Sequence, residues 1–511
     1  MIIVLDFGGQ FAHLIARRIK DLGAQAHILP YNAKIEEIMK FKPVGIILSG
    51  GPAAITGKNA IFPDMRIFDL KLPMLGICYG EQLIATRYGG KLAGRGEQRQ
   101  YGKEMMKVAK NSELFKGQLA QEQVWMSHGD AVTALPKGFE VIGSTEKCPV
   151  AAFEDRARKL YGLQFHPEVA HTTNGSKMIG NFVFGVCKAR KDYSLTGMDS
   201  MLIEDIRRKA KSGGVLIAVS GGVDSLVTAA LINRAVPNQL YSVFIDTGLM
   251  RKGEAEETEE YFKRMGFRHF EMIDASEIFL RKLKGVIDPE KKRKIIGHTF
   301  IEVFEKKALE LGKKARIGFL AQGTIYPDRI ESAQASKAAD KIKSHHNLTL
   351  PEKMNLKLIE PLKDLYKDEV RGLGEMLGLP HARVWRQPFP GPGLAIRIVG
   401  EVSPENVRIV READHIFRDE IAKAGLDSKI WQYFAALLPI KTVGVMADER
   451  TYEYIITLRA VTSKDGMTAD WAKIPYEVLE KISSRISNDV TGVNRVVYDV
   501  SQKPPATIEY E

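Results

Sequence analysis

The chain has 511 residues, of which 44% are hydrophobic and 27% charged, as is ordinary for globular proteins, and this length predicts two or three domains. We find neither a basic leader followed by a long apolar stretch nor an apolar run of membrane-spanning length, which argues against a signal peptide and a membrane helix. The net charge of +11 suits either nucleic acid or anionic small molecules as ligands.

The distribution of charge favours phosphate-bearing small ligands over nucleic acid. The most basic cluster, at 291–294, has no interleaved aromatic residues, and the chain has no helix-turn-helix or zinc-finger spacing. The three cysteines, Cys78, Cys148 and Cys187, fit neither a disulfide framework nor a zinc site. We therefore expect a reducing compartment, the cytoplasm, and structural roles for Cys148 and Cys187.

Residues 1–190 alternate short apolar runs with helical patterns, which predicts an α/β domain. We expect buried strands at 44–48 and 72–77 and helices at 17–22 and 81–88. The polar stretch at 188–199 interrupts the pattern and is expected to be a linker.

Cys78 stands between a predicted strand and a predicted helix, in the sequence Gly76-Ile77-Cys78-Tyr79-Gly80. Because a small residue lies on each side, the chain can turn sharply, lift the thiol above the sheet and point a helix N-terminus at it. That dipole, together with a nearby base, raises the thiolate fraction of a cysteine. Cys78 is therefore the candidate nucleophile.

A base and an orienting carboxylate occur together downstream, as His166 and Glu168. Alternation along a strand would put both side chains on one face. The oxyanion of an acyl transfer would then be stabilised by the backbone N–H groups of Gly51, in the turn at 49–52, and of Tyr79. A structural cysteine beside an unrelated His-Pro turn is the alternative, but the three segments together favour chemistry through a thioester.

The segments 49–52, 76–82 and 164–168 together resemble the class I glutamine amidotransferases, over about residues 1–190. The resemblance implies hydrolysis of the glutamine side-chain amide to glutamate and delivery of the ammonia to a second site. It also matches His128 and Asp130 to a segment on the substrate side of such domains.

A second α/β domain is expected at 196–386. Strand patterns at 215–219 and 241–245 flank a helical pattern at 224–235, which makes a βαβ unit with a Gly-rich first turn. The strand end at 243–246 lies where adenine binds in such folds, and core packing is the alternative for Val243 and Phe244.

The Gly-rich turn reads Ser220-Gly221-Gly222-Val223-Asp224-Ser225 and is followed by Leu226. Backbone N–H groups of such a turn, with a helix N-terminus behind them, form an anion site. The turn lacks the Gly-Lys ending of a Walker loop. It resembles the pyrophosphate loop of enzymes that cleave ATP to AMP and pyrophosphate, which implies ATP binding by 220–226 and Mg²⁺ binding by Asp224. An ordinary Gly-rich βα turn is the alternative.

The Pro- and Gly-rich stretch at 387–393 predicts a stiff connector, and a smaller α+β domain is expected at 387–511. Its patterns predict a helix at 405–424 and strands at 442–446, 452–459 and 495–500.

Five further segments occupy the C-terminal half, at 294–301, 321–328, 342–347, 389–395 and 503–509. In this order, and following the other two domains in the sequence, the five segments resemble those of the glutamine-hydrolysing GMP synthetases, and the resemblance covers essentially the whole chain. The resemblance implies that Mg-ATP adenylates xanthosine 5′-monophosphate (XMP), that ammonia displaces AMP to give GMP, and that the third domain forms a homodimer. It also implies a mobile lid at 281–301 and XMP contacts from Arg293, Asp328, Lys503 and Glu509.

Several positions depart from the family pattern. Leu226 replaces a common hydroxyl residue, Tyr510 a common tryptophan, and Ala447 a glycine. Gly466 stands where an aromatic residue is common, and Leu348-Thr349 where paired glycines often occur. These departures affect loops and the expected dimer surface and leave both predicted centres intact.

Two other functions remain as alternatives. One is a different glutamine-dependent amidating ligase, such as an NAD-synthase-like enzyme. The Cys78 turn and the C-terminal segment at 503–509 argue against this alternative. The other is a non-catalytic RNA-binding paralogue, which only the net charge of +11 suggests.

Overall fold

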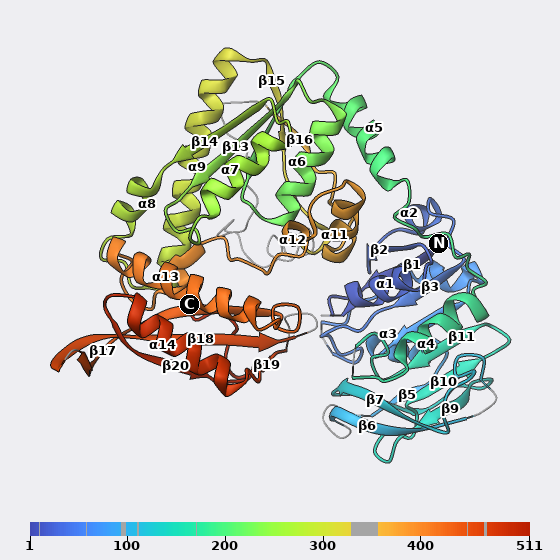
Figure 1. The fold of residues 1–511 in the computed structure, drawn as a ribbon. Helices are drawn as coiled ribbons and strands as arrows, with labels where there is room; N and C mark the ends of the chain where they lie inside the picture. Colours follow the sequence, from blue (N-terminus) through green and yellow to red (C-terminus); the bar gives the residue numbers. More distant parts are fainter. Residues whose placement is uncertain are drawn as a thin grey trace. The chain divides into compact units, whose positions relative to one another are not determined.

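The computed structural model describes residues 1–9, 11–57, 59–93, 99–109, 112–169, 171–328, 356–446, 448–463 and 468–511. These residues form two compact units, Met1–Ser194 and Leu195–Glu511, shown as ribbons in Figure 1. The boundary between the units falls inside the linker expected at 188–199. The departures at Ala447, Gly466 and Leu348-Thr349 lie outside the described residues.

The first unit is built on a nine-stranded sheet in the order β2-β1-β3-β4-β11-β10-β9-β6-β7. The first five strands of this order are parallel, and the rest pair antiparallel. The strands are β1 Ile2–Asp6, β2 Ala26–Pro30, β3 Gly45–Leu48, β4 Met74–Ile77, β6 Gln100–Val108, β7 Gln121–His128, β9 Glu140–Ser144, β10 Ala152–Asp155 and β11 Leu160–Leu163. A separate ribbon pairs β5 Lys91–Leu92 with β8 Val132–Ala134.

Helices cover both faces of this sheet because successive strand residues point to opposite sides. In β1, Ile2 and Val4 pack into one core and Ile3 and Leu5 into another. The first core is covered by α1 Ala12–Asp21, α4 Gly175–Gly180 and the helical segment η2 Asn181–Val186. The second is covered by α2 Ile35–Met39, η1 Met65–Leu70 and α3 Tyr79–Arg87. The predicted α/β architecture of this unit is confirmed.

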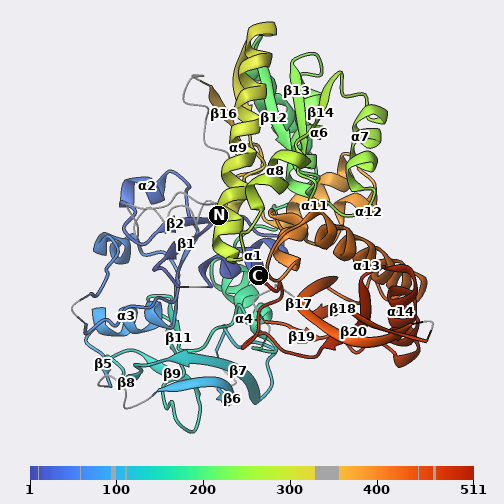
Figure 2. The same cartoon turned by 90° about the vertical axis from the view of Figure 1, so that its left-hand side faces the viewer.

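The second unit holds a five-stranded parallel sheet in the order β14-β13-β12-β15-β16. One face is covered by α8 and α9 and the other by α5, α6, α7 and α11, as Figure 2 shows for α9 and α7. The strands are β12 Gly214–Val219, β13 Leu240–Asp246, β14 His269–Asp274, β15 Ile317–Ala321 and β16 Lys357–Ile359. The helices are α5 Met198–Ala210, α6 Val223–Ala235, α7 Glu254–Arg264, α8 Ser276–Leu283, α9 Pro289–Lys314, α11 Lys367–Met376 and α12 His381–Val384.

A second, mainly antiparallel sheet of this unit is formed by the C-terminal residues. A long hairpin of β17 and β18 pairs with the short β19 and, in parallel, with β20. The helices α13 and α14 pack on it, and their buried residues join those of α9 in one continuous core. The elements are η3 Gly393–Arg397, α13 Pro404–Lys423, β17 Gln432–Met446, β18 Glu449–Thr462, β19 Asp470–Trp471, α14 Tyr476–Asp489 and β20 Val493–Asp499.

The predicted connector at 387–393 contacts the loop that follows β13. Gly393 has φ +64° and approaches the carbonyl oxygen of Leu249 so closely that a Cβ would overlap it, and the N–H of Leu394 donates to the same oxygen. Because 387–511 shares a core with α9, the division at residue 386 stays a prediction. The lid expected at 281–301 spans the end of α8 and the first half of α9, and it also stays a prediction.

None of the described helices is long and apolar enough to cross a membrane.

Candidate active sites

Cys78 occupies a strained turn between β4 and α3. Its backbone has φ 51° and ψ −104°, a left-handed conformation that non-glycine residues rarely adopt, and it is the N-cap of α3. A Cβ at Gly76 would overlap the carbonyl oxygen of Gly80, and one at Gly80 would overlap that of Leu48. The glycines on both sides are therefore required, and the thiol stands at a helix N-terminus as the sequence predicts.

His166 and Glu168 form a buried pair, with 2.7 Å between Nδ1 of His166 and Oε1 of Glu168. The prediction that strand alternation pairs them is wrong in its geometry. Strand β11 ends at Leu163, and the pair is formed in the turn that follows. The N–H of His166 donates to the carbonyl of Trp125, and Thr172 Oγ1 donates to the carbonyl of His166, so the turn is fixed on both sides.

The electrostatics of this pair favour a charged imidazole. Burial by itself lowers the pKa of His166, but the Glu168 carboxylate and the hydrogen bond with Cys78 raise it to about 10. Because Nδ1 is engaged by Glu168, Nε2 is the ring nitrogen available to the thiol. An imidazolium beside Cys78 stabilises a thiolate, the form that attacks a carbonyl carbon.

The turn that contains the predicted oxyanion donor Gly51 lies next to the Cys78–His166 pair. A Cβ on Gly50 would lie 3.1 Å from Cε1 of His166 and 3.6 Å from Cβ of Cys78, so the turn at 49–52 borders the pair. Gly51 packs on Phe7, and its own Cβ would lie 2.7 Å from the carbonyl oxygen of Phe7. Tyr79 is the first residue of α3, where a backbone N–H has no acceptor within the helix.

The segment that contains His128 and Asp130 also reaches this site. Sγ of Cys78 lies 3.8 Å from the carbonyl oxygen of Ser127. Burial lowers the pKa of His128 to about 4, and its Nδ1 lies 3.1 Å from the carbonyl oxygen of Asp130. His128 is therefore neutral. Gln82, which the sequence argument did not single out, donates from Nε2 to the same carbonyl at 2.7 Å.

The Gly-rich turn at 220–225 lies between β12 and α6, as predicted. Gly221 has φ +73°, and Gly222 is the N-cap of α6. The two serines hold the turn together: Ser225 Oγ accepts from the N–H of Ser220 at 3.2 Å and donates to the carbonyl of Gly222 at 3.0 Å. Ser220 and Gly222 are exposed, so the turn offers its backbone to a ligand.

Two of the residues predicted to bind ATP have side chains that face the core and not the exposed side of the turn. The side chains of Val223 and Leu226 are buried in the core beneath the sheet, and the N–H of Leu226 donates to the carbonyl of Gly222. The change from a hydroxyl residue to Leu226 therefore alters core packing and removes nothing from the exposed turn.

Asp224 is paired with a residue that the sequence argument missed. Nζ of Lys367, in the first turn of α11, lies 2.5 Å from Oδ2 of Asp224. A lysine in the first turn of a helix is unfavourable because its charge opposes the helix dipole. This placement was the signal in the sequence that could have pointed to a partner for Lys367. Gly323 packs closely against the backbone of Asp224, because a Cβ there would lie 2.9 Å from the carbonyl carbon of Asp224. The segment at 321–328 is thus brought to the Gly-rich turn.

The residues at this turn fit a bound Mg²⁺. Oδ1 of Asp224 is buried and has no hydrogen-bond partner among the described residues. Mg²⁺ is usually held by one or two carboxylates together with substrate phosphates, so a single carboxylate at a phosphate turn is an adequate protein ligand. The described residues contain no cluster of three or more His, Cys, Asp or Glu side chains arranged for a metal.

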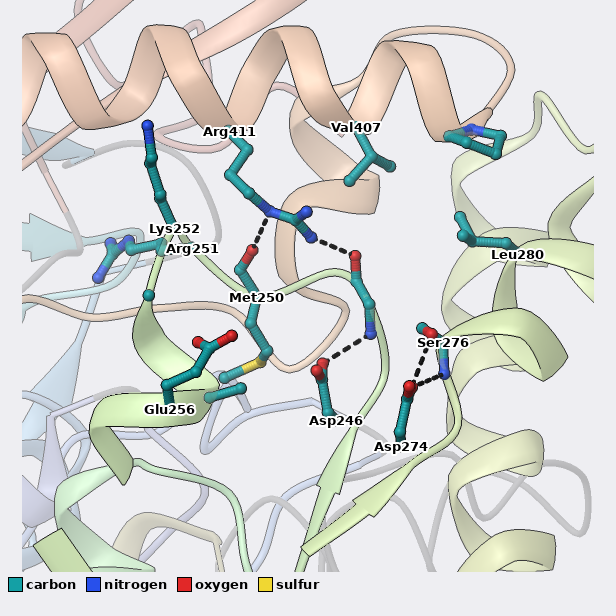
Figure 3. A pocket seen from close by; sticks show the side chains of 14 residues that line it. Asp246, Met250, Arg251, Lys252, Glu256, Asp274, Ser276, Leu280, Val407 and Arg411 are labelled. Atoms are coloured by element: carbon teal, nitrogen blue, oxygen red, sulfur yellow. Dashed lines mark hydrogen bonds between the residues drawn. The ribbon is translucent and has the colours of Figure 1, made fainter. Parts of the chain in front are cut away.

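A pocket of about 460 Å³ lies at the carboxyl ends of β13 and β14, beside α13 (Figure 3). Asp246 and Asp274 are register partners there, and burial raises the pKa of Asp246. Arg411 closes one side by donating to the carbonyls of Met250 and Gly248. The pocket begins where the strand predicted to border adenine ends.

Val243 and Phe244, which precede this pocket, are both 1% exposed and pack into the cores on opposite faces of the sheet. Their side chains therefore have the core role that was kept as the alternative.

The predicted XMP residues lie in three segments: Arg293 on α9, Asp328 after β15, and Lys503 and Glu509 near the C-terminus. Arg293 donates to the carbonyl of Glu511, and Arg397 binds the Glu509 carboxylate at 3.0 and 3.1 Å. Glu509 also accepts from Gln432 at 2.6 Å, so Arg397 and Gln432, which sequence reasoning missed, fix its position. Lys503 is placed by an isolated β-bridge to Ala469, and Asp328 accepts from the N–H of Ile325 at 3.0 Å.

Comparisons with known proteins identify the family of the chain. A family model described as glutamine amidotransferase class-I matches residues 3–186, and one described as GMP synthase C terminal domain matches residues 419–510. A curated protein from Clostridium botulinum named GMP synthase (glutamine-hydrolyzing) is 53% identical over 512 residues, covering 100% of this chain and 99% of that protein. Proteins of the same name from Clostridium novyi and Bacillus cereus are also 53% identical, with the same coverage. The chain therefore belongs to the glutamine-hydrolysing GMP synthases, ligases that use glutamine as the amide donor.

Proposed function

We propose that GMP synthesis by this chain is divided between two centres, with Cys78, His166 and Glu168 at the first and the turn at 220–225 at the second. The single observation that carries the first assignment is the strained Cys78 turn facing a buried His166–Glu168 pair. This geometry supports the proposal because a nucleophile at a helix N-terminus and a buried histidine–carboxylate pair are the groups that amide hydrolysis through a thioester uses.

At the first centre, Sγ of Cys78 attacks the side-chain carbonyl of glutamine. The oxyanion is stabilised by the N–H groups of Gly51 and Tyr79, and His166 gives its proton to the departing ammonia. Water then attacks the thioester, with His166 as the base, and glutamate is released. Glu168 holds the imidazole in the required orientation throughout.

At the second centre, the N–H groups of the turn and the α6 N-terminus bind the phosphates of ATP. The C2 oxygen of XMP attacks the α-phosphorus, and pyrophosphate leaves with the electrons of the broken bond. Ammonia then adds at C2 and AMP leaves, which gives GMP. When bound, Mg²⁺ would neutralise phosphate charge next to Asp224.

The XMP assignment follows the chemistry of the four residues. Arg293 and Lys503 are cations suited to the 5′-phosphate, and Asp328 and Glu509 can accept hydrogen bonds from base or ribose. Support comes from Glu509 being held by Arg397 and Gln432, which leaves its position defined before a ligand binds.

We also infer a homodimer through the β17–β18 hairpin. Val443 and Tyr452 are register partners with 59% and 65% exposure, and Val445, on the same face, is 72% exposed. Ile440 nearby is 55% exposed. An exposed apolar face of this kind favours association with a second copy of itself.

The experiment that tests the first centre is Cys78→Ala. We expect loss of GMP formation with glutamine and retention of GMP formation with free ammonium, since the second centre is untouched. Loss of both activities, in a variant with an unchanged melting temperature, would contradict two separable centres.

A further inference from the structure

Arg386, two residues after α12, contacts the Gly-rich turn at 220–225, although the proposed mechanism gives it no role. Its side chain is 17% exposed, and Nη1 donates to the carbonyl oxygen of Gly221 at 3.1 Å. Nη2 of the same guanidinium binds the carboxylate of Glu254, the first residue of α7. One planar side chain therefore joins the turn that precedes α6 to the start of α7.

Glu254 holds Arg386 in place. The Glu254 side chain is 7% exposed, and it lies in the first turn of α7, where the helix dipole favours a negative charge. Its Oε1 is bound by Arg386, and its Oε2 accepts from the backbone N–H of Arg251 at 3.2 Å. Since both carboxylate oxygens have donors, the guanidinium is fixed on a buried acceptor, and its Nη1 group is directed at one point of the turn.

The contact with Arg386 decides which way one peptide group of the turn faces. In a trans peptide the C=O and the N–H point in opposite directions, so a held Gly221 carbonyl turns the N–H of Gly222 the other way. The carbonyl of Gly222 is held in the same manner, by Ser225 Oγ at 3.0 Å and by the N–H of Leu226. Two successive peptide groups of the turn therefore have their carbonyls bound by the protein and their N–H groups directed away from these contacts.

Without Arg386, the peptide between Gly221 and Gly222 could take either orientation. Gly221 has φ +73°, and a peptide between two glycines can rotate because no Cβ obstructs either conformation. Rotation would turn the carbonyl oxygen toward a bound phosphate and the N–H away from it, so the turn would lose a donor and gain a repulsive contact.

We propose that Arg386 is a positioning residue for ATP, which holds the peptide between Gly221 and Gly222 with its N–H toward the phosphates. The inference rests on the proposed role of the turn in binding ATP and adds the side chain that orients it. Because the two donors of a guanidinium fork reach the carbonyl and the carboxylate together, a single ammonium group is a poor substitute.

The test is Arg386→Ala, with and without added guanidinium chloride. Pyrophosphate release is measured with XMP and with ammonium as the nitrogen source, so that the first centre is not needed. We expect kcat/KM for ATP to fall by roughly 10²-fold, as for a small misplacement of groups at a reacting centre. Guanidinium, at concentrations that do not unfold the protein, should restore the rate as its concentration rises, and the same concentration of sodium chloride should not.

The matched control is Arg383→Ala. Arg383 donates to the carbonyl of Glu257 at 2.9 Å and lies over the ring of Tyr261, so among the described residues its partners belong to α7 and not to the turn. This variant should keep its kcat/KM for ATP and show no response to guanidinium. Arg386→Lys, which keeps the charge without the planar fork, should lose activity toward ATP as R386A does.

Full activity of R386A, or of R386K, would overturn the inference, because the contact would then be unnecessary or the charge alone sufficient. A loss of activity that guanidinium does not restore would overturn it as well. Should R386A fold poorly, Glu254→Gln, which removes the charge that holds Arg386, should lower kcat/KM for ATP, and an unchanged value would count against the inference. None of these results decides the proposed function, which fails at this centre if Asp224→Asn still cleaves ATP at the normal rate.

Discussion

At the scale of single residues, we propose that the charge on His166 decides whether Cys78 is reactive. The pKa of the buried imidazole is about 10 because Glu168 and Cys78 outweigh the effect of burial. Glu168 is itself fully buried, so its interaction with the ring is little screened by water. The neutral His128 nearby adds no competing charge.

Replacing Glu168 by Gln should lower the pKa of His166, because burial then acts without the compensating carboxylate. The imidazolium, present below its pKa, would be lost at a lower pH, and the alkaline limb of glutamine hydrolysis would move to lower pH. We expect kcat/KM for glutamine to fall by roughly 10²-fold or more at pH 8, while ammonium-dependent GMP formation is unchanged. A profile that keeps its alkaline limb would refute the role of Glu168 in keeping His166 charged.

At the second centre, Asp224→Asn should stop the formation of AMP and pyrophosphate with either nitrogen source. The amide is a weaker ligand for Mg²⁺ and a weaker partner for Lys367, so we expect a loss of roughly 10²-fold or more in the rate of ATP cleavage. Asp205→Asn is the control, since Asp205 pairs with Lys209 and Arg208 on α5, away from the turn. Adenylation by D224N at the normal rate would exclude the assigned role.

At the scale of elements, the position of Cys78 depends on how closely α3 approaches β3. Gly80 lies against the backbone of Leu48, and its N–H donates to the carbonyl of Ser49 at 3.2 Å. This contact ties the nucleophile turn to the turn that carries the oxyanion donors. A helix set further from the sheet would separate the two.

Gly80→Ala should therefore destabilise the first unit by roughly 1–3 kcal/mol, the usual cost of overpacking, and should reduce glutamine hydrolysis by displacing Cys78. Gly185→Ala is the control, because the nearest atom to its Cβ, 3.8 Å away, is at an ordinary contact distance. Melting temperatures and glutaminase rates of both variants test the argument. Equal stability of the two variants would show that the close approach at Gly80 is not required.

The strands, turns and helices that hold these close backbone contacts could be predicted from local sequence. The strand–turn–helix patterns at Cys78 and at 220–225 were readable because Gly and apolar periodicity act within a few residues. The pairing of His166 with Glu168 was expected, but through a strand instead of a turn, since the end of β11 depends on its neighbours in the sheet. Lys367 and Arg397 were missed because their partners, Asp224 and Glu509, are more than a hundred residues away.

At the scale of the whole molecule, the chain forms two compact units, and we propose that they divide the chemistry between amide hydrolysis and nucleotide activation. Each unit has its own hydrophobic cores, so a substitution that disrupts the centre in one unit need not unfold the other unit. The hairpin of β17 and β18 adds an apolar face that the described residues of its own unit leave exposed.

Changing Val443 and Val445 to Glu should convert a dimer to a monomer, because each introduces a charge into the apolar face. Sedimentation velocity at micromolar concentration checks the result. Val141→Glu, on an exposed valine of the first unit, is the control. A dimer that persists in the double variant would show that the hairpin is not the interface.

The most direct test of two coupled centres is product analysis by mass spectrometry after incubation with glutamine, Mg-ATP and XMP. We predict GMP, AMP, pyrophosphate and glutamate in equal amounts, since one ammonia is consumed for each ATP cleaved. Glutamate without GMP, or AMP and pyrophosphate only when another acceptor replaces XMP, would contradict this account of the two centres.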